Sequence, residues 1–288
     1  MALLLSLLSS LCFGVALVTG RVGLRTLDAR SGAAISIPTA TVVFVVAAPF
    51  ALDIKGFTVE AALWFAAVGL LFPAVVTILT FRSNEQLGPT VTSTVSGTAP
   101  LFALLAAGLL LGERVPQQAA IASAAVVVGV GVLSWTGSAR RPGGAGWSLL
   151  WHISGAVLRG LAQVGAKAGL LLWPSAFAAG LIGYCVSSAT VIGASRMGRA
   201  GRPRPAKRSI AWFAATGILN GGAVLLMYAA LSMAPVAMVA PVVASYPLIT
   251  ALVSAAVLRE EALTARRVAG AGITAAAIIY LVAATPAA

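Results

Sequence analysis

Arg159 is the one charged residue that falls near the middle of a long apolar segment, residues 147–169. Gln163 and Lys167 follow it at four-residue steps, so a helix places the three side chains on one stripe. A charge that faces lipid costs several kcal/mol, and we therefore expect Arg159 to face a cavity or a partner. The stripe could recognise an anionic or carboxylate group. Alternatively, Arg159 is a packing residue bonded to backbone carbonyls, and Lys167 extends to the membrane interface.

Two prolines, Pro100 and Pro247, also lie inside apolar segments. Proline lacks an amide donor and clashes with the carbonyl four residues before it, so each helix should kink. Carbonyls freed by a kink are tolerated in lipid where they line a cavity or find another donor. We expect two symmetry-related cavity walls; the alternative is kinks that serve packing alone, with hydroxyls bonded to their own helix. The polar residues just before the prolines are Ser93, Ser96, Thr98, Ser245 and Tyr246.

Asn220 and Tyr228 add two polar side chains to another apolar segment, residues 209–231. They could contact a solute, or they could join neighbouring helices through hydrogen bonds. Gly217 and Gly221 form a GxxxG pair in the same segment, which is weak evidence for a homodimer. The residues predicted to line a substrate pathway are Arg159, Gln163, Ser96, Thr98, Pro100, Asn220, Tyr228, Ser245, Tyr246 and Pro247.

The composition indicates that these residues sit in lipid. Hydrophobic residues make up 60% of the 288, charged residues only 9%, and the mean hydropathy is +1.00. A soluble domain has about 25% charged residues. The apolar runs are long and do not alternate, which favours membrane-spanning helices over a barrel. We predict ten spans, at about 2–20, 33–52, 60–80, 88–111, 116–136, 147–169, 174–195, 209–231, 235–258 and 265–284.

An internal repeat organises these spans. Glycines, prolines and charges recur at a shift of 146 or 147 residues, in the pairs Gly14 and Gly160, Arg21 and Lys167, Pro89 and Pro235, Pro100 and Pro247, and Glu113 and Glu260. Because five spans is an odd number, the second copy must enter the membrane from the opposite side. Such inverted repeats are typical of transporters that bind substrate near the bilayer midplane. We expect repeats at 1–138 and 147–288, joined by a linker at 139–146.

The positive charges are distributed very unevenly between the two sides of the predicted bundle. Fifteen of the 19 Lys and Arg residues fall in the loops after odd-numbered spans, three fall in the opposite loops, and Arg159 lies inside a span. Positively charged loops stay in the cytoplasm. The bias supports ten spans and predicts that both termini lie outside the cytoplasm.

Each half ends with a turn, a proline-containing helix and an acidic residue before its last span. These segments are LGPTVTSTVSGTAPLFALLAAGLLLGERV (87–115) and APVAMVAPVVASYPLITALVSAAVLREEA (234–262). Both resemble the half-repeat of EamA-type transporters in the drug/metabolite transporter superfamily. The resemblance implies ten helices around a central cavity and transport, often outward, of metabolites such as amino acids or related solutes. Family members are usually described with both termini in the cytoplasm, the reverse of what the charges predict.

No motif for catalysis is present: the sequence has no nucleophile–base pair, no metal-ligand spacing and no phosphate loop. We therefore expect no enzyme activity, no cofactor, no metal and no nucleic-acid partner. The expected partners are a small-molecule solute and the lipid bilayer of the cell membrane. The alternative to a transporter is a membrane scaffold or an accessory subunit.

Overall fold

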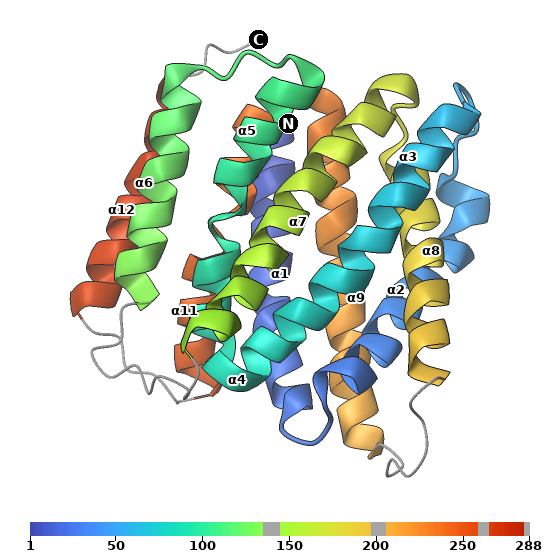
Figure 1. Cartoon of the computed structure of the whole chain (residues 1–288), viewed down its shortest axis with the longest axis horizontal. Coiled ribbons are helices and arrows are strands. Elements are labelled where there is room, and N and C mark those ends of the chain that lie inside the picture. The colour runs from blue at the N-terminus through green and yellow to red at the C-terminus, as the bar shows by residue number, and fades with distance from the viewer. Residues whose placement is uncertain (135–144, 197–205, 259–264, 285–288) are drawn as a thin grey trace.

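A computed structural model of the chain describes residues 1–134, 145–196, 206–258 and 265–284 (Figure 1). These residues form helices and contain no β-strand. The first half holds α1 (Ala2–Leu24), α2 (Ala29–Ala51), α3 (Val59–Gly69), the π-helix η1 (Leu70–Val75), α4 (Val76–Ser96), α5 (Ala99–Leu111) and α6 (Gln117–Ser134). The second half holds α7 (Ala145–Leu172), α8 (Ala176–Arg196), α9 (Lys207–Met233), α10 (Val236–Val243), α11 (Tyr246–Val257) and α12 (Ala265–Ala284).

Within the described residues, these elements form ten rods, five in each half. Two rods of the first half meet at Gly88, whose φ of 80° is a backbone conformation that glycine adopts readily. The rod before Gly88 consists of α3, η1 and the start of α4, and the rod after it consists of the rest of α4 with α5. In the second half, α10 and α11 together form one rod.

The chain is an all-α membrane protein. By length and composition, six helices in the described part are apolar enough to cross a membrane, and three shorter apolar helices accompany them. The linker predicted at 139–146 lies mostly outside the described residues.

Local sequence signals set several helix ends. The Asp28 carboxylate accepts a hydrogen bond from the Ser31 amide at 2.8 Å and caps α2. The Thr58 hydroxyl caps α3 in the same way. Gly112 ends α5 in a left-handed conformation, with φ of 63°.

The two halves run in opposite directions (Figure 1). Helix α1 descends from the N-terminus at the top of the view, whereas α7 rises from the bottom. The start of α1 and the end of α12 lie at the top, and α6 and α12 stand side by side in antiparallel orientation at the left edge. The second half therefore starts at the end of the bundle where the first half finishes, as expected for an inverted repeat.

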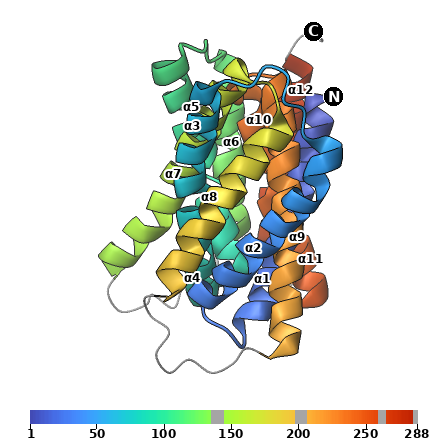
Figure 2. The same cartoon turned by 90° about the vertical axis from the view of Figure 1, so that its right-hand side faces the viewer.

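The halves interlock symmetrically. The first rod of each half packs against the third and fourth rods of the other: α1 against α9 and α11, and α7 against α3, α4 and α5. The second rods pair with each other, α2 with α8, and so do the last rods, α6 with α12. Figure 2, turned by 90°, shows α8 and α9 beside α2.

Two aligned glycines make the closest of these contacts possible. A Cβ atom on Gly160 would lie 2.8 Å from the Ala103 amide nitrogen and 2.9 Å from the Ala99 carbonyl oxygen of α5. A Cβ atom on Gly14 would lie 2.5 Å from the Ile249 Cβ and 3.0 Å from the Tyr246 carbonyl oxygen of α11. Both first rods therefore need glycine where they cross the fourth rod of the other half.

Both proline kinks occur where the sequence predicts them. The fourth rod breaks between α4 and α5, and Pro100 lies in the first turn of α5. The ninth rod breaks between α10 and α11, and Pro247 lies in the first turn of α11. Proline fits a first turn because the amide there has no helical partner.

The third rod is longer than the predicted span 60–80. It continues as helix to the turn at Gly88. Ser83 and Asn84 are buried there: the Ser83 hydroxyl accepts from Thr92 of the following rod, and the Asn84 amide donates to the Leu17 carbonyl of α1.

The GxxxG pair, Gly217 and Gly221, makes contacts within the chain. A Cβ atom on Gly217 would collide with the Ser36 carbonyl oxygen of α2, and one on Gly221 would lie 3.1 Å from the Ala40 Cβ. These glycines therefore bring α9 close to α2, and the motif supplies no evidence for a homodimer.

Candidate functional site

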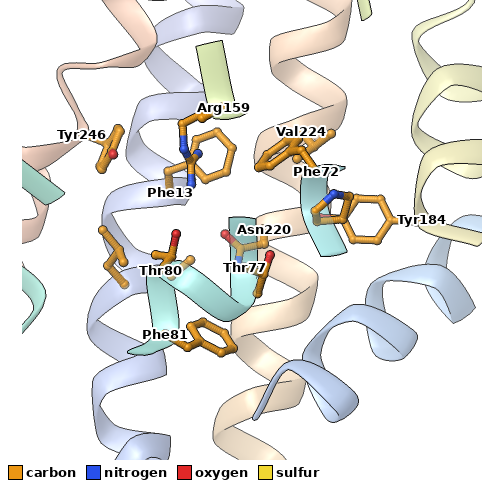
Figure 3. Close-up of a pocket in the computed structure, with 13 residues that line it drawn as sticks. Phe13, Phe72, Thr77, Thr80, Phe81, Arg159, Tyr184, Asn220, Val224 and Tyr246 are labelled. Atoms are coloured by element: carbon orange, nitrogen blue, oxygen red, sulfur yellow. The ribbon is translucent and has the colours of Figure 1, made fainter. Parts of the chain in front are cut away.

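A cavity lies between the halves, beside the middle of α1 and α7 (Figure 3). The space between its side chains, adjoining open space included, is about 470 Å³, but only about 30 Å³ of it is wide enough for water. The cavity is therefore narrow in the conformation described, well below the roughly 300–1,000 Å³ of a typical small-molecule pocket. The lining residues are Phe13, Ala16, Leu17, Phe72, Pro73, Thr77, Thr80, Phe81, Arg159, Tyr184, Asn220, Val224 and Tyr246.

Arg159 supplies the positive charge of this cavity. Its Cζ atom lies 5.3 Å from the centre of the Phe13 ring and 5.1 Å from the centre of the Phe72 ring, within cation–π range. The side chain is 9% exposed, and its Nε atom has no hydrogen-bond partner. Within the described residues, Arg159 has no carboxylate partner. The guanidinium is thus held by aromatic faces and keeps unused donor capacity.

Neutral polar groups complete the cavity. Figure 3 shows Thr77 and Asn220 next to each other in its centre, with Arg159 and Phe13 above them and Phe81 below. Hydroxyl and amide groups both donate and accept hydrogen bonds. The Tyr184 hydroxyl on the α8 side is buried and has no partner. The site therefore offers one fixed cation and several neutral groups that can bind a small polar solute.

A break in the third rod shapes one wall. Phe72, in η1, has φ of −137° and ψ of 123°, which are not helical. The break lies beside the cavity, where irregular backbone is tolerated in a membrane protein. It directs Phe72 toward Arg159 and starts α4 so that Thr77, Thr80 and Phe81 line the space. Pro73 was the sequence signal for this break, and the sequence interpretation did not use it.

Three of the predicted pathway residues line the cavity together: Arg159, Asn220 and Tyr246. They come from α7, α9 and the first turn of α11. The structure therefore brings together polar residues that lie far apart in the sequence.

The other predicted pathway residues lie outside the lining. Gln163 and Tyr228 are buried near it, and the Gln163 Oε1 atom has no hydrogen-bond partner. The Thr98 hydroxyl donates to the Val95 carbonyl at 2.7 Å. The Ser245 hydroxyl donates to the Val242 carbonyl at 2.7 Å and lies 2.9 Å from the Ser10 hydroxyl. Ser96, Pro100 and Pro247 are at the two kinks.

Lys167 does not extend to the membrane surface. It is buried, and its Nζ atom donates to the Leu231 carbonyl at 2.7 Å and the Ala234 carbonyl at 3.0 Å. Nearby, the Glu113 carboxylate accepts from the Val236 amide at 3.0 Å and caps α10. The end of α9 and the start of α10 are thus held by one charge of each sign.

Residues 1–135 and 146–283 match the sequence profile of the EamA-like transporter family. A solved structure described only as "Crystal structure of protein" superposes with a TM-score of 0.76 at 15% identity, over 97% of this chain and 96% of that one. At this identity the likeness shows the fold alone. No curated protein sequence matches the chain. Because the two profile matches cover nearly all of the chain, one over each half, the protein belongs to the EamA-like transporter family of the drug/metabolite transporter superfamily.

Proposed function

We propose that this membrane transporter carries a small solute with a carboxylate group, such as an amino acid or a related metabolite, through the cavity between its halves. The observation that carries the proposal is the buried Arg159 guanidinium, which has a spare donor and no carboxylate partner among the described residues. Guanidinium matches carboxylate geometry with two parallel hydrogen bonds, and such charge-assisted bonds are the strong ones.

The mechanism that fits this architecture is alternating access. Each first rod packs on the third and fourth rods of the other half, so the cavity is bounded by both repeats. Rocking of one repeat against the other would expose the cavity at one end and then at the other. The neutral Thr77, Thr80 and Asn220 side chains can bind the remaining polar groups of the solute in either state.

We further propose export as the direction and the cell membrane as the location. Outward transport is what the family resemblance suggests. The charge distribution supports termini outside the cytoplasm, because the loop that joins α1 to α2, which carries Arg25, lies at the end of the bundle opposite the start of α1 and the end of α12. Green fluorescent protein fused to the C-terminus should not fluoresce, because the fused domain would lie outside the cytoplasm. A fluorescent fusion would show that the C-terminus is cytoplasmic and would contradict this orientation.

The competing function is a scaffold or accessory subunit that carries nothing. Purified protein should first be screened for thermal stabilisation by amino acids and organic acids, since a ligand of the folded state raises the melting temperature. Proteoliposomes loaded with the best ligand should then take up its labelled form by counterflow. Arg159→Ala should lower this counterflow, and Arg30→Ala, at an exposed site, is the matched arginine control that should leave it unchanged. Ligand stabilisation without counterflow would favour the accessory role.

A further inference from the structure

A second polar cluster lies one helical turn beyond the cavity, where α1, α4 and α9 meet. We call it the basic-end cluster, and its residues are Thr19, Arg21, Asn84 and Thr216. The Asn84 amide nitrogen donates to the Leu17 carbonyl at 2.9 Å. Arg21 Nη1 donates to the Asn84 carbonyl at 2.9 Å. The Thr19 and Thr216 hydroxyls are 2.8 Å apart.

Two atoms of this cluster have no hydrogen-bond partner. Asn84 is 0% exposed, and its Oδ1 atom is a buried acceptor without a donor. The Arg21 Nε atom is a buried donor without an acceptor. Leaving such a group unsatisfied costs about 1–3 kcal/mol, and native proteins rarely do so without a reason. A carboxylate-bearing solute with a hydroxyl or ammonium group could satisfy both atoms.

Phe81 separates the cluster from the cavity. Its side chain lines the cavity and lies three residues before Asn84 on α4. The Phe81 ring packs against the Phe213 ring of α9, with centres 5.5 Å apart and planes at 51°. The Cβ position of Gly20 on α1 is 3.5 Å from the Phe81 ring and 3.9 Å from the Asn84 amide nitrogen. Phe81 would therefore have to rotate for the two polar regions to join.

Lys167, the residue of the second half that aligns with Arg21, has a similar set of contacts but differs in one atom. Lys167 aligns with Arg21, and both bind carbonyls at the end of the third rod of their own half. The contact of Arg21 with the Glu85 carbonyl matches that of Lys167 with Leu231, at the shift of 146. The two cationic groups therefore share a capping role, but of these two side chains Arg21 alone has a buried nitrogen without a hydrogen-bond partner.

We propose that the basic-end cluster is a second, transient binding position for the carboxylate-bearing solute, on its route between the cavity and the basic end of the bundle. Arg21 Nε binds the carboxylate, Asn84 Oδ1 accepts from the solute's donor group, and Phe81 closes the route in the conformation described. The inference rests on the proposed function and extends it to one side of the membrane.

Thiol labelling tests this route without knowing the solute. In a chain with Cys12→Ala and Cys185→Ala, single cysteines are placed at Thr216 in the cluster and at Thr80 in the cavity. Sided vesicles receive the membrane-impermeant anionic reagent sulfonatoethyl methanethiosulfonate or its cationic trimethylammonium counterpart. A cysteine at the exposed Arg30 marks the basic end. We expect the Thr216 cysteine to react from the basic end, and faster with the anionic reagent.

Charge variants then assign the preference to the cluster. Arg21→Gln and Asn84→Asp should each lower the ratio of anionic to cationic labelling rates at the Thr216 cysteine by about fivefold. Lys167→Gln, the symmetry-matched control, should leave that ratio unchanged. Asn84→Asp is nearly isosteric, which keeps the test usable if loss of the Arg21 cap prevents folding.

Three outcomes would overturn the inference. One is an unchanged ratio in both variants, and another is a Thr216 cysteine that stays unreactive from the basic end while the Thr80 cysteine reacts. Either result leaves the proposed function intact. A Thr80 cysteine that reacts from neither side would reject the cavity as a route and the inference with it.

Discussion

The first rods of the two repeats, α1 and α7, occupy equivalent places and differ in an instructive way. Gly14 and Gly160 both allow backbone contact with the fourth rod of the other half. Arg21 and Lys167 both bind carbonyls at the end of a third rod. In the cavity, however, Phe13 of α1 stands at the position of Arg159 in α7. Positions that build the fold are thus alike, whereas positions that face the cavity have diverged.

Phe13 and Arg159 are also in contact with each other, the guanidinium lying over the ring. The duplication therefore supplies a symmetric frame. The cavity within it is asymmetric, because one repeat contributes a cation where the other contributes an aromatic ring. A solute with one anionic end fits such a site. Substitutions that break or restore the symmetry should therefore separate folding from transport.

Breaking the shared frame should have the largest effect. Gly160→Val would place side-chain atoms against the backbone of α5, where a Cβ atom alone already lies within 2.9 Å of two backbone atoms. Overpacking costs about 1–3 kcal/mol, and rigid backbone contacts favour the upper end. We expect little folded protein by size-exclusion chromatography in detergent. Gly222→Ala on α9 is the control and should fold normally, because a Cβ atom at Gly222 would have no neighbouring atom within 4 Å. A well-folded Gly160→Val protein would show that α7 and α5 are not tightly packed where they cross.

Weakening the aromatic support of Arg159 should have an intermediate effect. Phe72→Leu removes a cation–π contact worth about 0.5–2 kcal/mol, so solute affinity should fall about twofold to thirtyfold. The dissociation constant of the solute found by the stability screen is the quantity to measure. Phe50→Leu, at a 91% exposed site, is the control and should leave affinity unchanged. Equal affinities in Phe72→Leu and wild type would mean that the ring does not hold the guanidinium.

Removing the α9 cap should affect stability and leave binding alone. Lys167→Met keeps the side-chain length but leaves the Leu231 and Ala234 carbonyls without their donor, at a cost of about 1–3 kcal/mol. The melting temperature should fall by several degrees, while the dissociation constant of the solute stays within twofold. A large loss of affinity at an unchanged melting temperature would place Lys167 in the solute route.

Making α7 more like α1 should have the smallest effect. Gln163→Leu copies Leu17, the aligned residue of α1, and removes a buried oxygen that has no hydrogen-bond partner. The melting temperature should be unchanged or higher, since a buried unsatisfied acceptor is costly. Initial counterflow rates should fall less than about fivefold. A complete loss of counterflow would show that Gln163 binds the solute as directly as Arg159.

The frame was predictable from the sequence because it depends on glycines, prolines and charges that recur in fixed register. Glycines at crossings, prolines at kinks and charges at span ends each have one physical reason to be where they are. Pro100 and Pro247 therefore predicted both broken rods, and the shift of 146 predicted an inverted repeat. The length of the third rod was not predictable, because Ser83 and Asn84 look like loop residues until their buried partners, Thr92 of the following rod and Leu17 of α1, are known.

The cavity was only partly predictable. Arg159 was identifiable because a mid-membrane charge must face a polar space, whereas Thr77, Thr80 and Tyr184 resemble ordinary hydroxyl residues of buried helices. The expectation that Arg159, Gln163 and Lys167 share one face toward the cavity was wrong, because Arg159 alone of the three lines it. Each four-residue step turns the side chain by about 40°, so Lys167 has rotated away from the cavity and meets the end of α9.

The most direct test of the account is the affinity of Arg159 variants for the solute. A hydrogen bond to a charged group contributes about 1.5–3 kcal/mol, so Arg159→Ala should raise the dissociation constant of the solute by about one to two orders of magnitude. Arg159→Lys keeps the charge, loses the two-pronged geometry and should be intermediate. Folding is checked in parallel by melting temperature. Arg159→Ala protein that folds normally, binds with wild-type affinity and transports at the wild-type rate would contradict the account, since Arg159 would then be a packing residue.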